Sequence, residues 1–408
     1  MNRPPTPTAG AHRGRDSPVR QASLREHNLA LVLRQVAATD TPPSRADVAA
    51  ATGLTRATVS TLIDELIGGG LVAELSPVPR SGAGRPPTGL VLSAGGPAGL
   101  GLEINVDYLA AYVMDLTGAV RHHQVVHADQ RAQPPAAALD SLADLAATAM
   151  SAAREAGLRV AGVALAVPGL VDTSGVVRLA PNLGWRDLAV HAALAPALGD
   201  SPLTVENEAN LAALGELSAG TDKDFLYLSG EIGIGAGIVL GGELFRGARG
   251  WSGEVGHLTV APDGPPCRCG SHGCLEQYAS QEAILRGAGH PVPVTPAAAA
   301  VDIITDRARA GDPAMLASLA RAGTVLGVAI AGVVNVLDLD TVILGGNYAP
   351  LTEWLADEVR RELAARVITA AWAPVRVRAG LLGTEATVVG AADSVVRAVR
   401  DSPSRWLT

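Results

Sequence analysis

The sequence predicts an α/β protein with a winged helix-turn-helix domain at its N-terminus and a larger two-lobed body behind it. Between residues 23 and 95, helical segments and two short strands follow one another in the order typical of a winged helix. In the remainder, strands precede helices twice over, which indicates two similar lobes around a cleft. Charge divides in the same way: residues 1–95 hold ten arginines and seven acidic residues, whereas the rest holds 22 basic and 33 acidic residues.

The composition excludes several classes of protein. A chain of 408 residues that is 48% hydrophobic and 18% charged is neither wholly disordered nor a highly basic coat for nucleic acid. No apolar run approaches the ~18 residues that span a bilayer, and the N-terminus lacks the apolar segment of a secretory signal. We therefore expect a cytoplasmic protein without a membrane partner. Residues 1–22, rich in Pro, Arg, Ser and Gly, are expected to be a disordered tail.

The domain predicted over residues 23–95 begins with three helices and ends with a two-stranded wing. The predicted elements are helices Ser23–Ala38, Arg45–Ala51 and Arg56–Gly68, then strands Leu71–Leu75 and Gly89–Leu92. Ser44, with Asp47 three residues on, and Thr55 are candidate N-caps. Gly53 permits the turn between the second and third helices.

Five side chains of this domain are candidate DNA contacts. Arg56, Thr58 and Ser60 lie on the exposed side of the third helix and could reach base edges or phosphates in a major groove. Arg80 and Arg85 lie on a Gly/Pro-rich loop that could enter a minor groove. The alternatives are a small helical domain that binds protein and a solvated linker loop.

Residues 96–408 are expected to form the two-lobed body. The predicted strands are 99–104, 110–115, 120–126, 160–167, 204–206, 225–230, 235–240, 341–344 and 376–379. The predicted helices are 136–156, 209–218, 314–337, 353–366 and 386–399.

All three cysteines of the chain lie close together and follow a histidine. His257, Cys267, Cys269 and Cys274 fall within 18 residues, and glycines in the loop let its backbone fold back. Thiolates and imidazole suit tetrahedral Zn²⁺, and a site with four protein ligands is structural. We expect this structural zinc in a loop over residues 257–276. His272 is the competing fourth ligand, and a cluster of reduced thiols is the alternative.

From about residue 99 to residue 397 the chain resembles the ROK family, which includes sugar kinases and sugar-responsive repressors. The matching stretches are Ala166–Asp172, Ala180–Trp185, Glu206–Glu216, Gly233–Gly237, Gly253–His257, Cys267–Glu276 and Val342–Gly346. The resemblance implies an actin-like body, with two lobes of the ribonuclease-H type around a sugar. The repressor branch of the family adds a winged helix and a Gly-Arg-Pro segment, which here is Gly84-Arg85-Pro86.

The resemblance also implies which side chains hold sugar hydroxyls. They are Asn182, Asn207, Glu208, Glu254, His257 and Glu276. Carboxylates and amides can satisfy vicinal hydroxyls, which donate and accept hydrogen bonds at once. For Glu254 and Glu276 taken alone, ion pairing with nearby arginines is the alternative.

The sequence departs from the kinases of the family at three places. Asp-x-Gly-Gly-Thr on their first hairpin is replaced here by residues 103–107, Glu-Ile-Asn-Val-Asp. Their Gly-Thr-Gly-x-Gly loop is replaced by Glu231-Ile-Gly-Ile-Gly. Their catalytic aspartate is Glu208 here, whose extra methylene moves the carboxylate by roughly an ångström, and such a shift can cost ~10²-fold in rate. The pocket is therefore expected to bind a sugar without catalysing phosphorylation.

Three functions follow from these patterns. The first is a sugar-responsive transcriptional regulator, expected to be a repressor, that binds operator DNA as a homodimer or homotetramer. The second is an ATP-dependent sugar kinase with an accessory DNA-binding domain. The third is a protein that sequesters sugar or binds a protein partner and has no operator.

Overall fold

The computed structural model describes residues 21–39, 41–75, 88–230, 232–293 and 297–407. The chain forms two compact units, Met1–Leu92 together with Arg400–Thr408, and Ser93–Val399. Of the predicted tail, residues 1–22, positions 1–20 lie outside the described residues. Its last two residues, 21 and 22, begin the first helix.

The N-terminal unit has the predicted order of helices and strands. Its elements are α1 (Gln21–Ala37), α2 (Arg45–Thr52), α3 (Arg56–Gly68), β1 (Val72–Glu74) and β2 (Leu90–Leu92). The two strands pair antiparallel, with Ala73 opposite Val91. Val48, Val59 and Ile63 are fully buried between the helices, as a helix-turn-helix requires.

Both helix caps predicted for this unit are present. The Ser44 side chain accepts a hydrogen bond from the Asp47 amide, and the Asp47 carboxylate accepts one from the Ser44 amide. The Ser44 hydroxyl and amide lower the pKa of Asp47. Thr55 caps α3 with a single bond, which its side chain accepts from the Thr58 amide, and Gly53 ends α2 with φ 71°, in the left-handed region.

The end of the chain also belongs to the N-terminal unit, which differs from the predicted extent of the second domain, residues 96–408. A short 3₁₀ helix, η5 (Pro403–Trp406), contacts α1, and Arg34 Nη1 lies 3.2 Å from Asp401 Oδ1. Gly69 lies directly under Leu407, because a Cβ at position 69 would stand 2.5 Å from Leu407 Cδ2. These contacts are far apart in sequence, so helical periodicity does not predict them.

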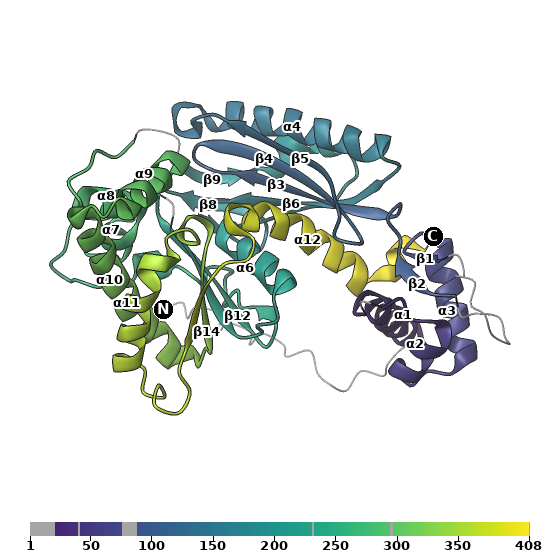
Figure 1. Ribbon diagram of the computed structural model, residues 1–408. Coiled ribbons are helices and arrows are strands. Elements are labelled where there is room, and N and C mark those ends of the chain that lie inside the picture. Colours follow the sequence, from purple (N-terminus) through teal and green to yellow (C-terminus); the bar gives the residue numbers. More distant parts are fainter. Residues whose placement is uncertain (1–20, 40, 76–87, 231, 294–296, 408) are drawn as a thin grey trace, which may run out of the picture. The chain divides into compact units, whose positions relative to one another are not determined.

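The first lobe of the larger unit is a five-stranded sheet in the order β10-β6-β3-β4-β5 (Figure 1). The strands are β3 (Pro97–Ile104), β4 (Tyr108–Asp115), β5 (Val120–His127), β6 (Arg159–Val167) and β10 (Leu203–Asn207). Strands β3, β4 and β5 form an antiparallel meander, whereas β6 and β10 run parallel to β3. Helix α4 (Pro135–Glu155) crosses one face of this sheet and buries Leu139, Leu142 and Leu145.

The second lobe repeats this arrangement, with strand order β13-β12-β11-β14-β15. The strands are β11 (Phe225–Gly230), β12 (Ile234–Leu240), β13 (Glu243–Leu244), β14 (Thr341–Gly345) and β15 (Arg376–Ala379). The helices α6 (Glu208–Ala219), α10 (Pro313–Leu337) and α11 (Thr352–Arg366) cover the sheet. Within the described chain, α10 is the one helix long and apolar enough to cross a membrane, but it lies in the core of this lobe.

Helix α12 (Ala386–Asp401) packs against both lobes through glycines. A Cβ at Gly99 of β3 would stand 2.2 Å from the Ala392 carbonyl oxygen, and a Cβ at Gly390 would stand 1.9 Å from that of Leu211 in α6. Only glycine allows backbones to approach this closely.

Short elements that the hydrophobic pattern did not predict complete the larger unit. They are η1 (Gln130–Ala132), β7 (Leu170–Val171), β8 (Val176–Ala180), β9 (Trp185–Ala189), α5 (His191–Leu198), η2 (Val255–His257), α7 (Glu276–Ala279), α8 (Gln281–Gly287), α9 (Ala297–Arg309), η3 (Gly346–Tyr348) and η4 (Gly383–Glu385). Several of them carry the residues of the site described next.

Candidate functional site

A cleft of about 310 Å³ lies between the two lobes of the larger unit. All six predicted sugar-binding residues line it: Asn182, Asn207, Glu208, Glu254, His257 and Glu276. The apolar part of the wall includes Val106, Leu170, Leu179, Ile232 and Ile234. The cleft therefore combines a few polar groups with an apolar wall, as small-molecule sites do.

The junction of β10 and α6 presents two of these polar side chains. Asn207 caps α6, because its Oδ1 accepts hydrogen bonds from the amides of Ala209 and Asn210. Its Nδ2 donates to the Gly169 carbonyl oxygen at 3.0 Å, which fixes the side chain at the cleft. Glu208 begins the helix and therefore projects from a rigid position into the same cavity.

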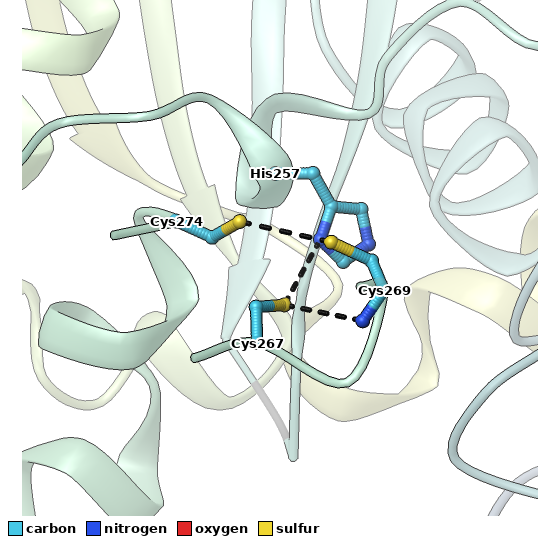
Figure 2. Close-up of side chains that lie close together, drawn as sticks. All are labelled: His257, Cys267, Cys269 and Cys274. Carbon is cyan, nitrogen blue, oxygen red and sulfur yellow. Dashed lines mark hydrogen bonds between the residues drawn. The ribbon is translucent and has the colours of Figure 1, made fainter. Parts of the chain in front are cut away.

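His257 and the three cysteines come together beside the cleft, which His257 and Cys269 line, and Figure 2 shows the four side chains pointing toward one another. Their ligand atoms all lie within 4.8 Å of one another. Cys267 Sγ is 3.7 Å from His257 Nδ1, and the Sγ atoms of Cys269 and Cys274 are 3.7 Å apart. The four residues could hold one metal ion, and His272, the competing ligand, is an exposed residue outside the cluster.

The charges around this cluster favour a bound cation. Burial raises the pKa of the Cys267 and Cys274 thiols, and the carboxylate of Glu276, whose Oε1 is 2.9 Å from Cys267 Sγ, raises that of Cys267 further. Three thiolates beside a carboxylate are unfavourable unless a positive charge offsets them. The donor set fits a metal such as zinc.

Glu254 stands between the cluster and the cleft. Desolvation raises the pKa of Glu254, and its Oε2 lies 3.8 Å from His257 Nε2. Since Nδ1 of the imidazole faces the thiols, Nε2 is the nitrogen left toward Glu254 and the cavity. A metal on Nδ1 would thus fix the orientation of a ring that can donate from Nε2.

The hairpin at residues 103–108, where the kinases of the family carry Asp-x-Gly-Gly-Thr, is bridged by hydrogen bonds among its own side chains. Tyr108 donates from its hydroxyl to Glu103 Oε1 at 2.7 Å, and Asn105 Nδ2 lies 3.1 Å from the same hydroxyl oxygen. Asn105 and Val106 line the cleft, whereas Asp107 is buried and is not among its lining residues. Glu231, which begins the segment that replaces the Gly-Thr-Gly-x-Gly loop of the kinases, lies outside the described residues.

The predicted DNA contacts are only partly covered by the structure. Arg56 is exposed at the start of α3, and its guanidinium makes no hydrogen bond or ion pair with another described residue. Thr58 is half-buried and pairs its hydroxyl with that of Thr55, 2.8 Å away, and Ser60 is half-buried. Arg80 and Arg85 lie outside the described residues.

The sequence interpretation missed two arginines near the cleft. Arg268 lines it between two cysteines of the cluster, and its Nη1 lies 3.4 Å from Asn182 Oδ1. Arg246 binds Glu206, the residue before Asn207, with 2.8 Å between Nε and Oε2. Arg268 could have been found from the sequence, because it lies inside the Cys-x-Cys motif. Arg246 could not, because its partner Glu206 is 40 residues away in the sequence.

Comparisons with known proteins agree with this architecture. The ROK family model matches residues 99–398. The chain belongs to the ROK family. The IclR helix-turn-helix domain model matches residues 28–76, so this ROK protein joins a DNA-binding domain to a ROK body.

Relatives of similar length are transcriptional regulators. The xylose repressor of Bacillus spizizenii is 29% identical over 379 residues, which is 92% of this chain and 96% of the relative. A crystal structure of a ROK family transcriptional regulator, a homologue of the E. coli Mlc protein, is similar with a TM-score of 0.77 and 25% identity, covering 94% of this chain and 99% of its own. The chain is thus a ROK transcriptional regulator.

ROK kinases match a smaller part of the chain. The glucokinase of Streptomyces coelicolor is 32% identical over 317 residues, 72% of this chain and 97% of the enzyme. The structure of a Streptomyces griseus glucokinase in complex with glucose and AMPPNP covers 73% of this chain and 98% of its own, with a TM-score of 0.61 and 32% identity. Over a quarter of this chain therefore has no counterpart in either kinase.

Proposed function

We propose that the protein is a repressor that binds operator DNA through its N-terminal unit and releases it when a pentose sugar, xylose or a close relative, occupies the cleft. The observation that carries this is the convergence of all six predicted sugar-binding side chains on one cavity of about 310 Å³ in a chain that also has a helix-turn-helix domain. The relative named a xylose repressor supports the choice of sugar.

The chemistry of the cleft suits a neutral sugar. Glu208, Glu254 and Glu276 can accept hydrogen bonds from hydroxyl groups, and Asn182 can both donate and accept. Asn207 keeps one Nδ2–H donor for a hydroxyl, because its Oδ1 already accepts two amide bonds and its other N–H bonds to Gly169. His257, oriented by the metal cluster, adds a donor at Nε2. The apolar wall suits the C–H faces of a sugar ring.

Zinc is the metal that we propose for the cluster. With four protein ligands and no position left for substrate, the ion would stabilise the loop between His257 and Glu276. Because Glu254 and Glu276 flank this loop, zinc would also fix two sugar-binding carboxylates.

The same geometry supports a protein that binds sugar without phosphorylating it. The side chains of Glu103, Asn105 and Tyr108 bond to one another on the hairpin where kinases of the family carry two glycines. Glu208 then serves as a hydroxyl acceptor. A kinase with an accessory DNA-binding domain is the second candidate, supported by the two glucokinases.

A thermal-shift titration with xylose tests the proposed effector. Xylose should raise the melting temperature of the full-length protein, because a ligand that binds only the folded state stabilises it. Glu254→Gln should weaken this response at least about tenfold, since a charge-assisted hydrogen bond to the sugar is lost. An ATP-consumption assay with the same sugar separates the candidates: turnover well above background would contradict the proposal and favour the kinase.

A further inference from the structure

A second cavity, of about 520 Å³, lies in the second lobe where α7 and α8 pack against α10. Helix α7 contributes to both cavities, because Glu276 lines the sugar cleft and the next two residues, Gln277 and Tyr278, line the second one. Its volume falls within the range of small-molecule sites. None of the functions assigned above uses it.

The charge of this cavity is opposite to that of the sugar cleft. Arg286 and Arg321 are the charged residues among those that line it, and no carboxylate is among them. The sugar cleft, in contrast, has three glutamates and one arginine. Acidic residues outnumber basic ones 33 to 22 beyond residue 95, so a cavity lined by arginines alone among charged residues differs from the rest of this unit. A cavity with two guanidinium groups and no acid in its wall suits an anion.

Both guanidinium groups keep donors available. Arg321 donates from Nη2 to the Gly287 carbonyl oxygen at 2.9 Å, and Arg286 Nη1 lies 3.4 Å from Glu282 Oε2. Among the described residues these are the hydrogen bonds that the structure gives them. A guanidinium carries five N–H donors, so most of them remain for a ligand.

The simpler explanation is that the two arginines stabilise the C-terminal end of α8. The carbonyl groups there attract cations, and Arg286 lies in the last turn. The bond from Arg321 to Gly287 fits this explanation. It does not explain why Arg286 also faces a cavity of this size, nor why both residues remain exposed, with the Arg286 side chain 50% accessible.

Two contacts connect the cavity to the sugar cleft. Glu282 Oε2, which pairs with Arg286, also lies 4.0 Å from Nη2 of the cleft residue Arg268. Gln277 Nε2, in the second cavity, lies 3.4 Å from Oε1 of the cleft residue Glu276. An anion that binds Arg286 would compete with Glu282, whose carboxylate could then shift toward Arg268.

We propose that this cavity binds a small phosphorylated metabolite through Arg286 and Arg321. A phosphate monoester carries oxygen acceptors that match the fork of a guanidinium, and Tyr278 and Gln277 offer further polar contacts. Through Glu282, its binding changes the affinity of the cleft for sugar, and sugar changes the affinity for the phosphate by the same factor. This coupling rests on the proposed sugar site, whereas the anion site does not.

Isothermal titration of the full-length protein with glucose 6-phosphate, glucose and inorganic phosphate tests the site. Glucose 6-phosphate and inorganic phosphate should bind, and Arg321→Met should weaken both at least about tenfold, because a charge-assisted hydrogen bond is lost. The control is Arg309→Met, an exposed arginine 3.7 Å from Glu353 that does not line the cavity, and it should bind as the wild type does. Circular dichroism melts show whether each variant is folded.

A second variant is expected to bind phosphate more tightly, and a misfolded protein could not give that result. Glu282→Gln removes the carboxylate that competes for Arg286, so it should bind inorganic phosphate more tightly than the wild type. Equal binding of glucose 6-phosphate by wild type and Arg321→Met would place it in the sugar cleft and overturn the proposal. No heat from either phosphate at millimolar concentration would overturn it too. If phosphate binding depends on Arg321 but the protein does not bind xylose, the anion site is supported and the proposed sugar effector is refuted.

Discussion

At the scale of single residues, the sugar cleft depends on a few side chains whose positions are fixed by bonds to their own neighbours. The Oδ1 atom of Asn207 accepts hydrogen bonds from amides at the start of α6, and its Nδ2 donates one to the Gly169 carbonyl group. The side chain is therefore held in position before a sugar binds. His257 is fixed in a comparable way, because its Nδ1 faces the cysteines. Such preorganisation lowers the entropic cost of binding.

The metal cluster makes a prediction about individual residues. Cys269→Ser should lose bound zinc, lower the melting temperature and weaken the response to sugar together, because the loop from His257 to Glu276 loses its anchor. His272→Ala should keep the metal, since His272 lies outside the cluster. Metal content by mass spectrometry and thermal melts measure both, and equal loss of zinc in the two variants would refute the assignment of His257.

Arg56 makes the corresponding prediction for DNA. It is exposed at the N-terminal end of α3, so Arg56→Ala should weaken operator binding and reduce the dependence of affinity on salt by about one counterion. The matched control is Arg25→Ala, because Arg25 already pairs with Glu65 at 2.7 Å. Titrations with DNA at several salt concentrations check this. An unchanged affinity in Arg56→Ala would contradict the prediction that α3 lies in the major groove.

At the scale of elements, the last residues of the chain act as a part of the N-terminal unit. Leu407 packs over Gly69, and η5 contacts α1. A chain that ends at Ser402 should therefore lose about 2 kcal/mol from the stability of this unit, because partly buried apolar side chains are removed. Operator affinity should fall while xylose binding stays. A chain that ends at Leu407 is the control, and a truncation that leaves DNA binding intact would contradict this role.

Much of this element order could be predicted from sequence, because periodic apolar residues and caps are local signals. Ser44 and Thr55 marked the starts of α2 and α3 correctly, and the boundaries of α3 were predicted to the residue. Strands β7, β8 and β9 were missed, because β7 has only two residues and charged residues interrupt the apolar residues of β8 and β9. The place of Pro403–Trp406 could not be predicted, because only long-range contacts define it.

The site shows the same division between local and long-range information. The four candidate metal ligands lie within 18 residues of sequence, so their spacing alone predicted the cluster that the structure brings together. The polar wall of the cleft was predicted from motifs of the family, not from spacing. The second cavity has no motif, because Arg286 and Arg321 come from separate helices that meet only in the fold.

At the scale of the whole molecule, the proposed function requires coupling between the sugar cleft and the DNA-binding unit. Sugar can change operator affinity only if it binds the DNA-competent and the DNA-free states with different affinities. A ratio of ~100 between these affinities would supply ~2.7 kcal/mol of coupling. The operator is expected to be palindromic, since a dimer with two-fold symmetry presents two copies of α3.

The most direct test of this claim is the affinity of the full-length protein for an operator selected from random DNA, measured by fluorescence anisotropy with and without xylose. Xylose should lower the affinity of the wild type at least about tenfold, and it should have little effect on Glu254→Gln, whose affinity without sugar should match that of the wild type. An operator affinity that stays the same with xylose, glucose and every other sugar tried would contradict the account.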